Sequence, residues 1–209
     1  MGISYCKKRS DVVKKALFLI LDEYADWESA YLSSTLNQRE DWSVYTISLN
    51  EKVRSIGGFQ TSVDYIIGTE PEDFHLLVLI GGNSWDNDDE KLYQFVNKVF
   101  QKDLPIGAIC GAVDYLAKNG FLNEHNHTGN SVAMWGGYEN YHPNRSFLEE
   151  QAVKDRNLVT ANGTAPIEFT ALVLEMIEFD TLENIEKTTY MYRHGFYKYS
   201  EKYGNPFLN

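Results

Sequence analysis

The sequence predicts one doubly wound α/β domain, in which helices cover both faces of a mostly parallel β-sheet. Continuous apolar runs of strand length alternate with segments of helical spacing, and the chain carries no fixed-period repeat. Strands that are apolar on both sides must be buried on both faces, as they are in a parallel sheet between two helical layers. The length of 209 residues suits a single domain with a sizeable core.

The first third of the chain is predicted to contain two strands, a helix and a hairpin. The apolar run at residues 16–21 predicts the first buried strand, and apolar side chains at helical spacing predict a helix over residues 26–36. Alternating side chains over residues 44–48 predict the second strand. Residues 53–66 carry Gly57-Gly58 between β-prone flanks, so we expect a hairpin that projects from the main layer.

Two more buried strands are predicted in the middle of the chain. Residues 76–80 form a second apolar run, which ends at Gly81-Gly82, and residues 90–100 have helical spacing. Residues 106–109 form a third apolar run, which leads straight into Cys110. We therefore expect both runs in the sheet, with a helix between them.

The last strand and helix of the domain are predicted at residues 157–160 and 166–177. We assign residues 1–178 to a single α/β domain and residues 179–209 to a carboxyl-terminal extension rich in aromatic side chains. Such an extension either packs back on the domain or forms part of a subunit interface, and the sequence does not choose between them.

The charge balance excludes two kinds of partner. The chain has 19 basic and 30 acidic side chains, which gives a net charge of −11. This charge repels phosphate backbones and anionic lipid, so a nucleic-acid or membrane partner would need a basic patch. The largest basic cluster, residues 7–15, lies at the amino terminus and is typical of a solvated chain end. We expect neither partner.

The two cysteines indicate the cellular compartment. Cys6 and Cys110 are too few for a disulfide framework, which favours a reducing environment. The apolar run at residues 16–21 is too short to span a bilayer, and no small-residue cleavage site follows it. We therefore expect a cytoplasmic protein.

Cys110 is the strongest candidate for chemistry. Ligand crevices of parallel sheets lie at the carboxyl ends of the strands, and Cys110 stands between a strand and a helix-like stretch. Small residues on both sides, Gly107-Ala108 and Gly111-Ala112, leave room for a tight turn. A helix start favours the thiolate, which is the reactive form. On spacing alone, a buried cysteine that serves as a small apolar side chain is an equal alternative.

Two other strand ends carry candidate residues. Glu28 lies on the first turns of a helix and can point across the crevice toward Cys110, where a buried, protonated carboxyl would donate to the thiolate. An ordinary solvated glutamate in an acidic stretch is the stronger interpretation on spacing alone. The amides of Gly82 and Gly111 could form a two-donor oxyanion hole, and a tight turn with positive φ is the alternative at Gly82.

Five motifs in order along the chain carry a resemblance to a known family. They are Glu28, Gly81-Gly82-Asn83-Ser84-Trp85, Ala108-Ile109-Cys110-Gly111-Ala112, His127-Thr128-Gly129-Asn130 and residues 158–169. Together they resemble the DJ/PfpI superfamily over about residues 15–177. The resemblance implies a flavodoxin-like fold related to class I glutamine amidotransferases, in a group that includes PfpI-type intracellular proteases.

The resemblance also implies roles for single residues. Cys110 matches the family's nucleophile and Glu28 matches the buried glutamate that contacts it, which reverses the preference for a solvated Glu28. Gly82 and Gly111 match the donors of the oxyanion hole. The positions expected to line the site are Asn83, Trp85, Asn130 and Thr164.

The chain departs from the family pattern at its histidines. PfpI-type proteases carry a histidine directly after the cysteine, where this chain has Gly111, and other members carry one at the position aligned with Asn130. His127 lies nearby and is our candidate for a catalytic histidine, although one member of the His125 and His127 pair is expected in solvent. No third ligand accompanies the pair, so we expect no metal and no other cofactor.

The acidic segment at residues 86–90 resembles the start of a calcium loop. Lys91 stands where such a loop needs its turn glycine, so this interpretation fails. The acids are better suited to cap the helix that follows.

Three functions are consistent with these residues. The leading hypothesis is a cysteine-dependent hydrolase of PfpI type that acts on a peptide or small-molecule substrate. The alternatives are a glyoxalase or deglycase that acts on small dicarbonyls or their adducts, and a redox sensor or stress chaperone that uses oxidation of Cys110. The absence of the usual family histidine beside the cysteine weakens peptidase activity most, because amine leaving groups need a general acid. By resemblance to the family we also expect a homodimer.

Overall fold

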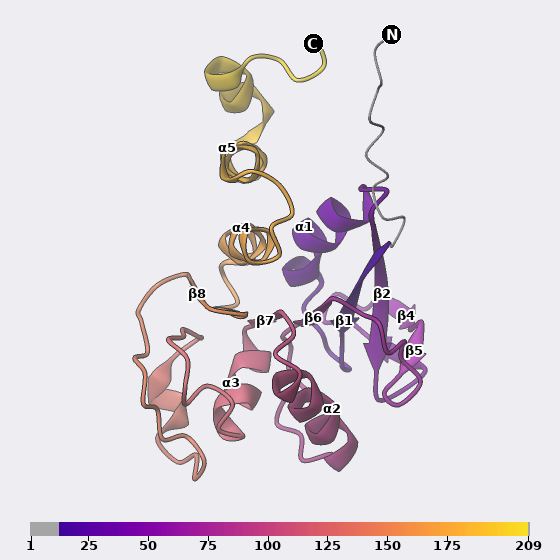
Figure 1. Cartoon of the computed structure of the whole chain (residues 1–209), viewed down its shortest axis with the longest axis vertical. Helices are drawn as coiled ribbons and strands as arrows, with labels where there is room; N and C mark the ends of the chain where they lie inside the picture. The colour runs from indigo at the N-terminus through magenta and orange to yellow at the C-terminus, as the bar shows by residue number, and fades with distance from the viewer. Residues whose placement is uncertain (1–12, 209) are drawn as a thin grey trace, which may run out of the picture.

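The computed structural model describes residues 13–208, and a seven-stranded sheet lies at its centre (Figure 1). The strands are β1 (Lys14–Leu19), β2 (Trp42–Ser48), β5 (Tyr65–Ile66), β6 (Leu76–Leu79), β7 (Ile106–Ile109), β8 (Ala152–Asp155) and β9 (Leu158–Ala161). Their order is β5-β2-β1-β6-β7-β9-β8, and every pair is parallel except β8 with β9. The predicted mostly parallel α/β fold is confirmed. Cys6 and most of the basic cluster lie outside the described residues.

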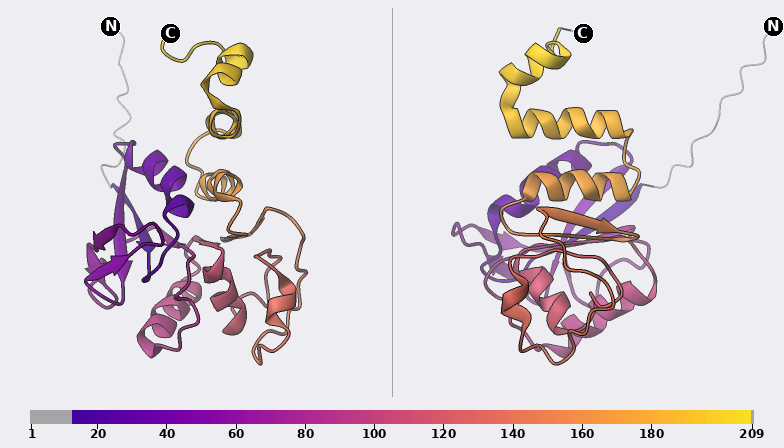
Figure 2. Two further views of the ribbon diagram at one scale, coloured as in Figure 1. Left: turned by 180° about the vertical axis from the view of Figure 1, so that it is seen from behind. Right: turned by 90° about the vertical axis from the view of Figure 1, so that its left-hand side faces the viewer.

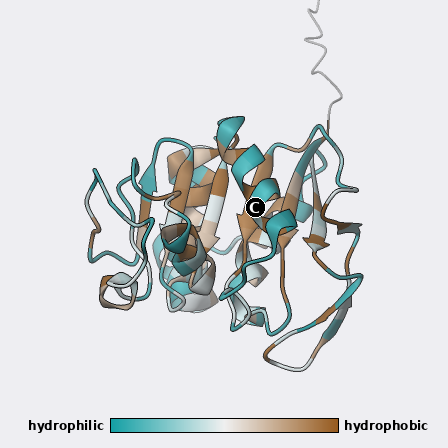
Figure 3. Ribbon diagram, turned by 90° about the horizontal axis from the view of Figure 1, so that it is seen from below, coloured by the Kyte–Doolittle hydropathy of each residue, from teal (hydrophilic) through white to brown (hydrophobic). Residues whose placement is uncertain are grey.

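Helices cover both faces of this sheet. The helices are α1 (Asp26–Asn37), α2 (Glu90–Gln101), α3 (Gly111–Lys118) and α4 (Pro166–Met176). Figure 1 shows α1 and α4 on one face and α2 and α3 on the other. Leu17 and Leu19 of β1 join the core under α2 and α3, whereas Ala16 and Phe18 join the core under α1 and α4. Figure 3 shows the apolar character of the strands that results from burial on both sides.

A separate hairpin lies beside the carboxyl end of β1. Strands β3 (Lys52–Arg54) and β4 (Gln60–Ser62) pair antiparallel, as predicted for residues 53–66. The amide of Gly57 at the tip donates to Asp26 Oδ2 over 2.8 Å. The hairpin is thereby tied to the start of α1, at the edge of the sheet where parallel strands place ligands.

Helix α5 (Leu182–Tyr203) follows α4 and contains a break. Gly195 has φ 81° and ψ 168°, which ends the regular helix within this span. Figure 2 shows the first part lying along α4, where Ile185 and Thr189 are buried, and the second part standing away from the domain. Tyr197 on this second part is 86% exposed. The extension therefore packs on the domain over only part of its length.

The segment between α3 and β9 contains two elements that the sequence did not predict. They are a 3-10 helix at Val132–Trp135 and the antiparallel strand β8. Both are short and neither has a regular apolar period, so local pattern gives little signal for them. Across the described part of the chain, no helix combines the length and apolar character that a bilayer-spanning segment needs.

Candidate active site

Cys110 occupies a strained turn between β7 and α3. Its backbone has φ 59° and ψ −131°, which a residue with a Cβ rarely adopts and which costs about 1–3 kcal/mol. The Cys110 amide donates to Ala161 O over 3.0 Å, and its carbonyl accepts from Val113 N over 2.9 Å. These bonds hold the thiol at the carboxyl edge of the sheet, in the geometry of a nucleophile elbow.

Glu28 projects from the first turns of α1 into the same space and is fully buried. Its Oε2 accepts from the amide of Gly81 over 2.8 Å, and its Oε1 has no nitrogen or oxygen hydrogen-bond partner among the described residues. A Cβ placed on Gly163 would lie 2.8 Å from Cys110 Sγ and 3.1 Å from Glu28 Oε1. Since one atom would contact both groups, the thiol and the carboxyl face each other across Gly163.

Glycine is required at two positions for this approach. A Cβ on Gly81 would collide with Cys110 Cβ and would lie 2.6 Å from Glu28 Oε2. On the other side, Gly163 is held by Trp27, whose Nε1 donates to the Gly163 carbonyl over 3.1 Å. The sequence alone assigns no role to Trp27. Only its position directly before Glu28 in the sequence indicates that it lies near the site.

Burial sets the protonation of the pair. It raises the pKa of Glu28 to about 7, although hydrogen bonds with the Cys110 thiol and the Gly81 amide act in the opposite direction. Burial also raises the pKa of the Cys110 thiol, against the lowering effect of the Asn130 side chain. The Gly111 amide at the helix start does favour the thiolate, as expected, but burial and the nearby carboxyl outweigh it and the net pKa of Cys110 is raised.

Asn130 links the nucleophile to the Gly163 loop. Its Nδ2 lies 3.4 Å from Cys110 Sγ, and its Oδ1 accepts from the Gly163 amide over 2.9 Å. Both ends of the side-chain amide are thus used, which fixes its orientation. Asn130 therefore lies next to the sulfur, at the position that aligns with a histidine in other family members.

The two candidate oxyanion donors lie beside the nucleophile. Gly82 has φ 145°, and its amide has no hydrogen-bond acceptor among residues 13–208, while the Gly111 amide points to the Cys110 sulfur. Gly82, Gly111, Asn83 and Met134 contribute to the lining of a cavity of about 300 Å³. A carbonyl oxygen bound there would meet amide donors that have no other strong acceptor.

Two other predicted lining residues use their polar atoms elsewhere. The Nε1 of Trp85 donates to Ile80 O over 2.8 Å, so the buried Trp85 contributes its ring to the cavity wall. The Thr164 hydroxyl donates to Asn162 Oδ1 over 2.5 Å. Neither side chain offers a polar group to a ligand at Cys110.

His127 is not brought to Cys110. Its Nδ1 lies 2.6 Å from His125 O and its Nε2 lies 2.8 Å from Tyr141 Oη. The ring is fully buried against Trp135 and Phe147. Burial lowers the pKa of His127, so the ring is a neutral member of an aromatic core. The geometry gives no support to the predicted catalytic role.

Among the described residues, no group of three or more His, Cys, Asp or Glu side chains could hold a metal ion.

Replacing Gly111 with histidine, which restores the residue order of PfpI-type proteases, is expected to damage this site. A Cβ at position 111 would lie 2.6 Å from the Gly82 carbonyl oxygen, so the backbone must move. We expect a loss of about 1–3 kcal/mol in the free energy of unfolding and slower alkylation of Cys110. Chemical denaturation and iodoacetamide labelling measure the two effects. Gly137→His is the control, because no atom lies within 4 Å of its Cβ position; equal behaviour of the two variants would contradict the steric argument.

The fold and these contacts define a class of protein: an α/β protein with a cysteine at a strained strand-to-helix turn that faces a buried glutamate. The chain belongs to the DJ-1/PfpI family, whose model matches residues 14–176. This result confirms the resemblance that the five motifs predict.

Relatives by sequence and relatives by structure both support this assignment. The chain is 68% identical over 197 residues to the "Uncharacterized protease YdeA" of Bacillus subtilis, which covers 94% of this chain and all of the relative. It is 31% identical over 189 residues to the "Uncharacterized protease YoaZ" of the same organism, a match that covers 82% of this chain and 88% of the relative. Among solved structures, a thiJ/pfpI family protein from Bacillus anthracis has a TM-score of 0.83 at 28% identity. The match covers 91% of this chain and 95% of that protein. The DJ-1 superfamily protein Atu0886 from Agrobacterium tumefaciens has a TM-score of 0.78 at 26% identity, with coverage of 87% and 99%.

Proposed function

We propose that this protein is a cysteine-dependent hydrolase in which Cys110 attacks the carbonyl carbon of a peptide or amide. The observation that carries this proposal is the strained Cys110 turn, which places the thiol opposite the buried carboxyl of Glu28. The protease names of the two Bacillus subtilis relatives favour the same reaction class.

Glu28 can supply the proton transfers for which other family members have a histidine. Because burial raises its pKa to about 7, Glu28 exists in both protonation states near neutral pH. The carboxylate accepts the thiol proton as the sulfur–carbon bond forms, and the carbonyl electron pair moves to oxygen beside Gly82 and Gly111. When the tetrahedral intermediate collapses, Glu28 returns the proton to the leaving amine. Water then hydrolyses the thioester, with Glu28 again as the base.

A specific observation favours a second candidate. The cavity that adjoins Cys110 through Gly82 and Gly111, without being lined by Cys110 itself, measures about 300 Å³, which is at the lower end for small-molecule sites. Such a cavity admits a small dicarbonyl or a single side chain of a peptide. Attack on a dicarbonyl releases no amine and makes a weaker demand on an acid. Glyoxalase chemistry is therefore the alternative use of the same thiol; deglycase chemistry on an adduct would release an amine and would need Glu28 as its acid.

The hydrolase proposal predicts a particular pH dependence. Since Glu28 must be ionised to accept the thiol proton, kcat/KM for a peptide or amide is expected to rise with pH through about 7. The experiment measures initial rates across this range for a panel of peptide amides and for methylglyoxal, and traps the acyl-enzyme on Cys110 by acid quench and mass spectrometry. A trapped acyl adduct supports the hydrolase. Turnover of methylglyoxal without any acyl adduct would replace it with the alternative.

A further inference from the structure

Three hydrogen bonds in a row connect the exposed side of α1 with the nucleophile. Trp27 Nε1 donates to Gly163 O over 3.1 Å, and the Gly163 amide donates to Asn130 Oδ1 over 2.9 Å. Asn130 Nδ2 in turn donates to Cys110 Sγ over 3.4 Å. In each bond the group further from the sulfur is the donor, so the three bonds form one chain that runs toward the sulfur.

The backbone of Gly163 sets the direction of this chain. Its amide can only donate, so the end of the Asn130 side chain that faces it must be the carbonyl oxygen. The NH₂ end is then the one that faces the sulfur, and it can only donate. A donor at this position favours the thiolate: the Asn130 side chain lowers the pKa of Cys110, whereas burial and Glu28 raise it.

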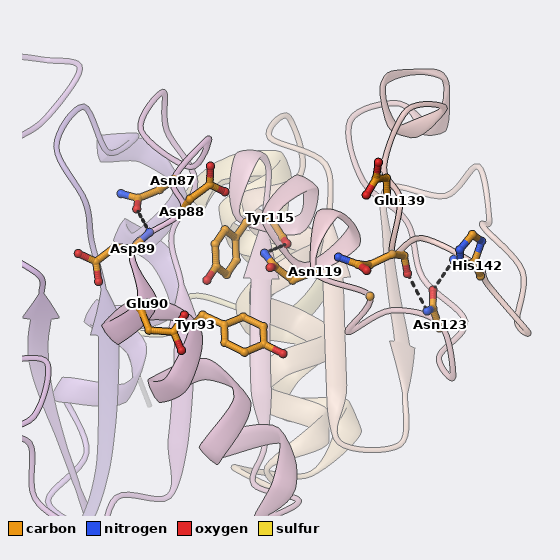
Figure 4. A pocket seen from close by; sticks show the side chains of 12 residues that line it. Asn87, Asp88, Asp89, Glu90, Tyr93, Tyr115, Asn119, Asn123, Glu139 and His142 are labelled. Atoms are coloured by element: carbon orange, nitrogen blue, oxygen red, sulfur yellow. Dashed lines mark hydrogen bonds between the residues drawn. The ribbon is translucent and has the colours of Figure 1, made fainter.

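Another asparagine of the chain is fixed in the same way but away from the site. In the loop that follows α3, Asn123 Oδ1 accepts from the His142 amide over 2.9 Å, and Asn123 Nδ2 donates to Asn140 O over 2.9 Å (Figure 4). Both ends of Asn123 thus meet backbone groups, and the side chain ties two stretches of loop together. The donor end of Asn130 meets the reacting sulfur instead of a backbone carbonyl.

The outer end of the chain of bonds is open to solvent. Trp27 is 48% exposed and Asn130 is exposed as well. Water can reach the indole N–H and the Gly163 carbonyl, so the bond between them is not needed to pair a buried group. Its consequence is the position of the Gly163 loop, and with it the direction of the Asn130 donor.

We propose that Trp27 is a positioning residue for the Cys110 nucleophile. By holding the Gly163 loop, the Trp27 indole keeps the Asn130 donor on the sulfur, where it stabilises the thiolate. This inference deepens the proposed function, because it concerns the same thiol. Alkylation of Cys110 by iodoacetamide needs no hydrolase activity, so it tests the positioning role separately from turnover.

Asn130→Leu tests the last bond of the chain, because leucine keeps the shape of asparagine and has no donor. Labelling of Cys110 at neutral pH, followed by mass spectrometry, should slow about threefold to tenfold, and the pH profile of labelling should move to higher pH. Asn123→Leu is the matched control and should label Cys110 as the wild type does. An unchanged profile in Asn130→Leu would overturn the proposal.

Trp27→Phe tests the first bond, because phenylalanine keeps an aromatic ring and lacks the N–H. Labelling of Cys110 should slow about threefold, with a shift of the pH profile in the same direction and little change in the thermal midpoint. Tyr31→Phe is the control: Tyr31 lies one turn further along α1, its ring packs on Tyr192, and it takes part in none of the three bonds. A wild-type profile in Trp27→Phe would show that the indole does not position the nucleophile.

The double variant shows whether Trp27 acts through Asn130. Trp27→Phe should slow labelling in the wild type and have no further effect in Asn130→Leu, since the donor is already absent. Slowing by the same factor in both backgrounds would contradict the proposed chain. Altered labelling without turnover of any peptide amide or methylglyoxal would exclude the proposed function and leave the positioning role intact, whereas turnover with unaltered labelling would do the reverse.

The wild type decides the question if Trp27→Phe lowers the thermal midpoint by more than about 5 °C. In ¹⁵N NMR the Trp27 indole resonance should move as Cys110 ionises, and this response should shrink in Asn130→Leu. The indole of Trp42, which is buried at the opposite end of the sheet at the start of β2, should not respond. A Trp27 resonance that is insensitive to the ionisation of Cys110, or equally sensitive in Asn130→Leu, would show that the proposal is wrong.

Discussion

Replacing Cys110 with serine is expected to lower kcat/KM for peptide or amide hydrolysis by about 10³-fold or more. The serine hydroxyl is a far weaker acid than the thiol, and a carboxylate whose pKa is about 7 is too weak a base to ionise it. The substituted atom is slightly smaller and the strained backbone is kept, so the fold should survive. Steady-state rates and the thermal midpoint separate loss of chemistry from loss of structure.

The second cysteine supplies the control for this experiment. Cys6→Ser is expected to retain full activity and to leave iodoacetamide labelling of Cys110 unchanged. Full activity of Cys110→Ser would exclude both the hydrolase and the dicarbonyl enzyme. It would leave a function that does not depend on this cysteine.

The elements that position the site could be predicted because local pattern determines them. A continuous apolar run such as residues 106–109 is compatible only with burial on both faces, and the small residues around Cys110 allow one sharp turn. The structure places Glu28 and Cys110 face to face because two parallel strands bring their carboxyl ends to the same edge of the sheet.

Other features depend on contacts that local pattern does not contain. The surroundings of His127 come from Tyr141, Trp135 and Phe147, which lie 8 to 20 positions further along the chain in a segment with little regular structure. The pKa of Cys110 is raised by burial, and burial is a property of the packed domain. The sequence does predict the start of a helix at Cys110, and that helix start alone would lower the pKa of Cys110.

Glu28→Gln is expected to make the protein more stable at alkaline pH and less active. Burial raises the Glu28 pKa from its ordinary value of 4.5 to about 7, so the folded chain keeps a proton that the unfolded chain has already lost between these values. The free energy of unfolding of the wild type therefore falls as pH rises through this interval, by roughly 3 kcal/mol for this group alone. Glutamine does not titrate, so the variant lacks this decline.

The measurement is the difference in free energy of unfolding between variant and wild type, obtained by denaturation at about pH 4 and about pH 8. This difference should shift by roughly 3 kcal/mol in favour of the variant, while Glu72→Gln, at an exposed position outside the site, should leave it unchanged. Hydrolysis should fall by about 10²-fold or more in Glu28→Gln, because the amide cannot carry the proton. A buried carboxyl that weakens the fold above neutral pH and supports catalysis there is the expected property of a functional group. If the variant shows neither the gain in stability nor the loss of activity, Glu28 is an ordinary carboxyl and the proposed proton transfers fail.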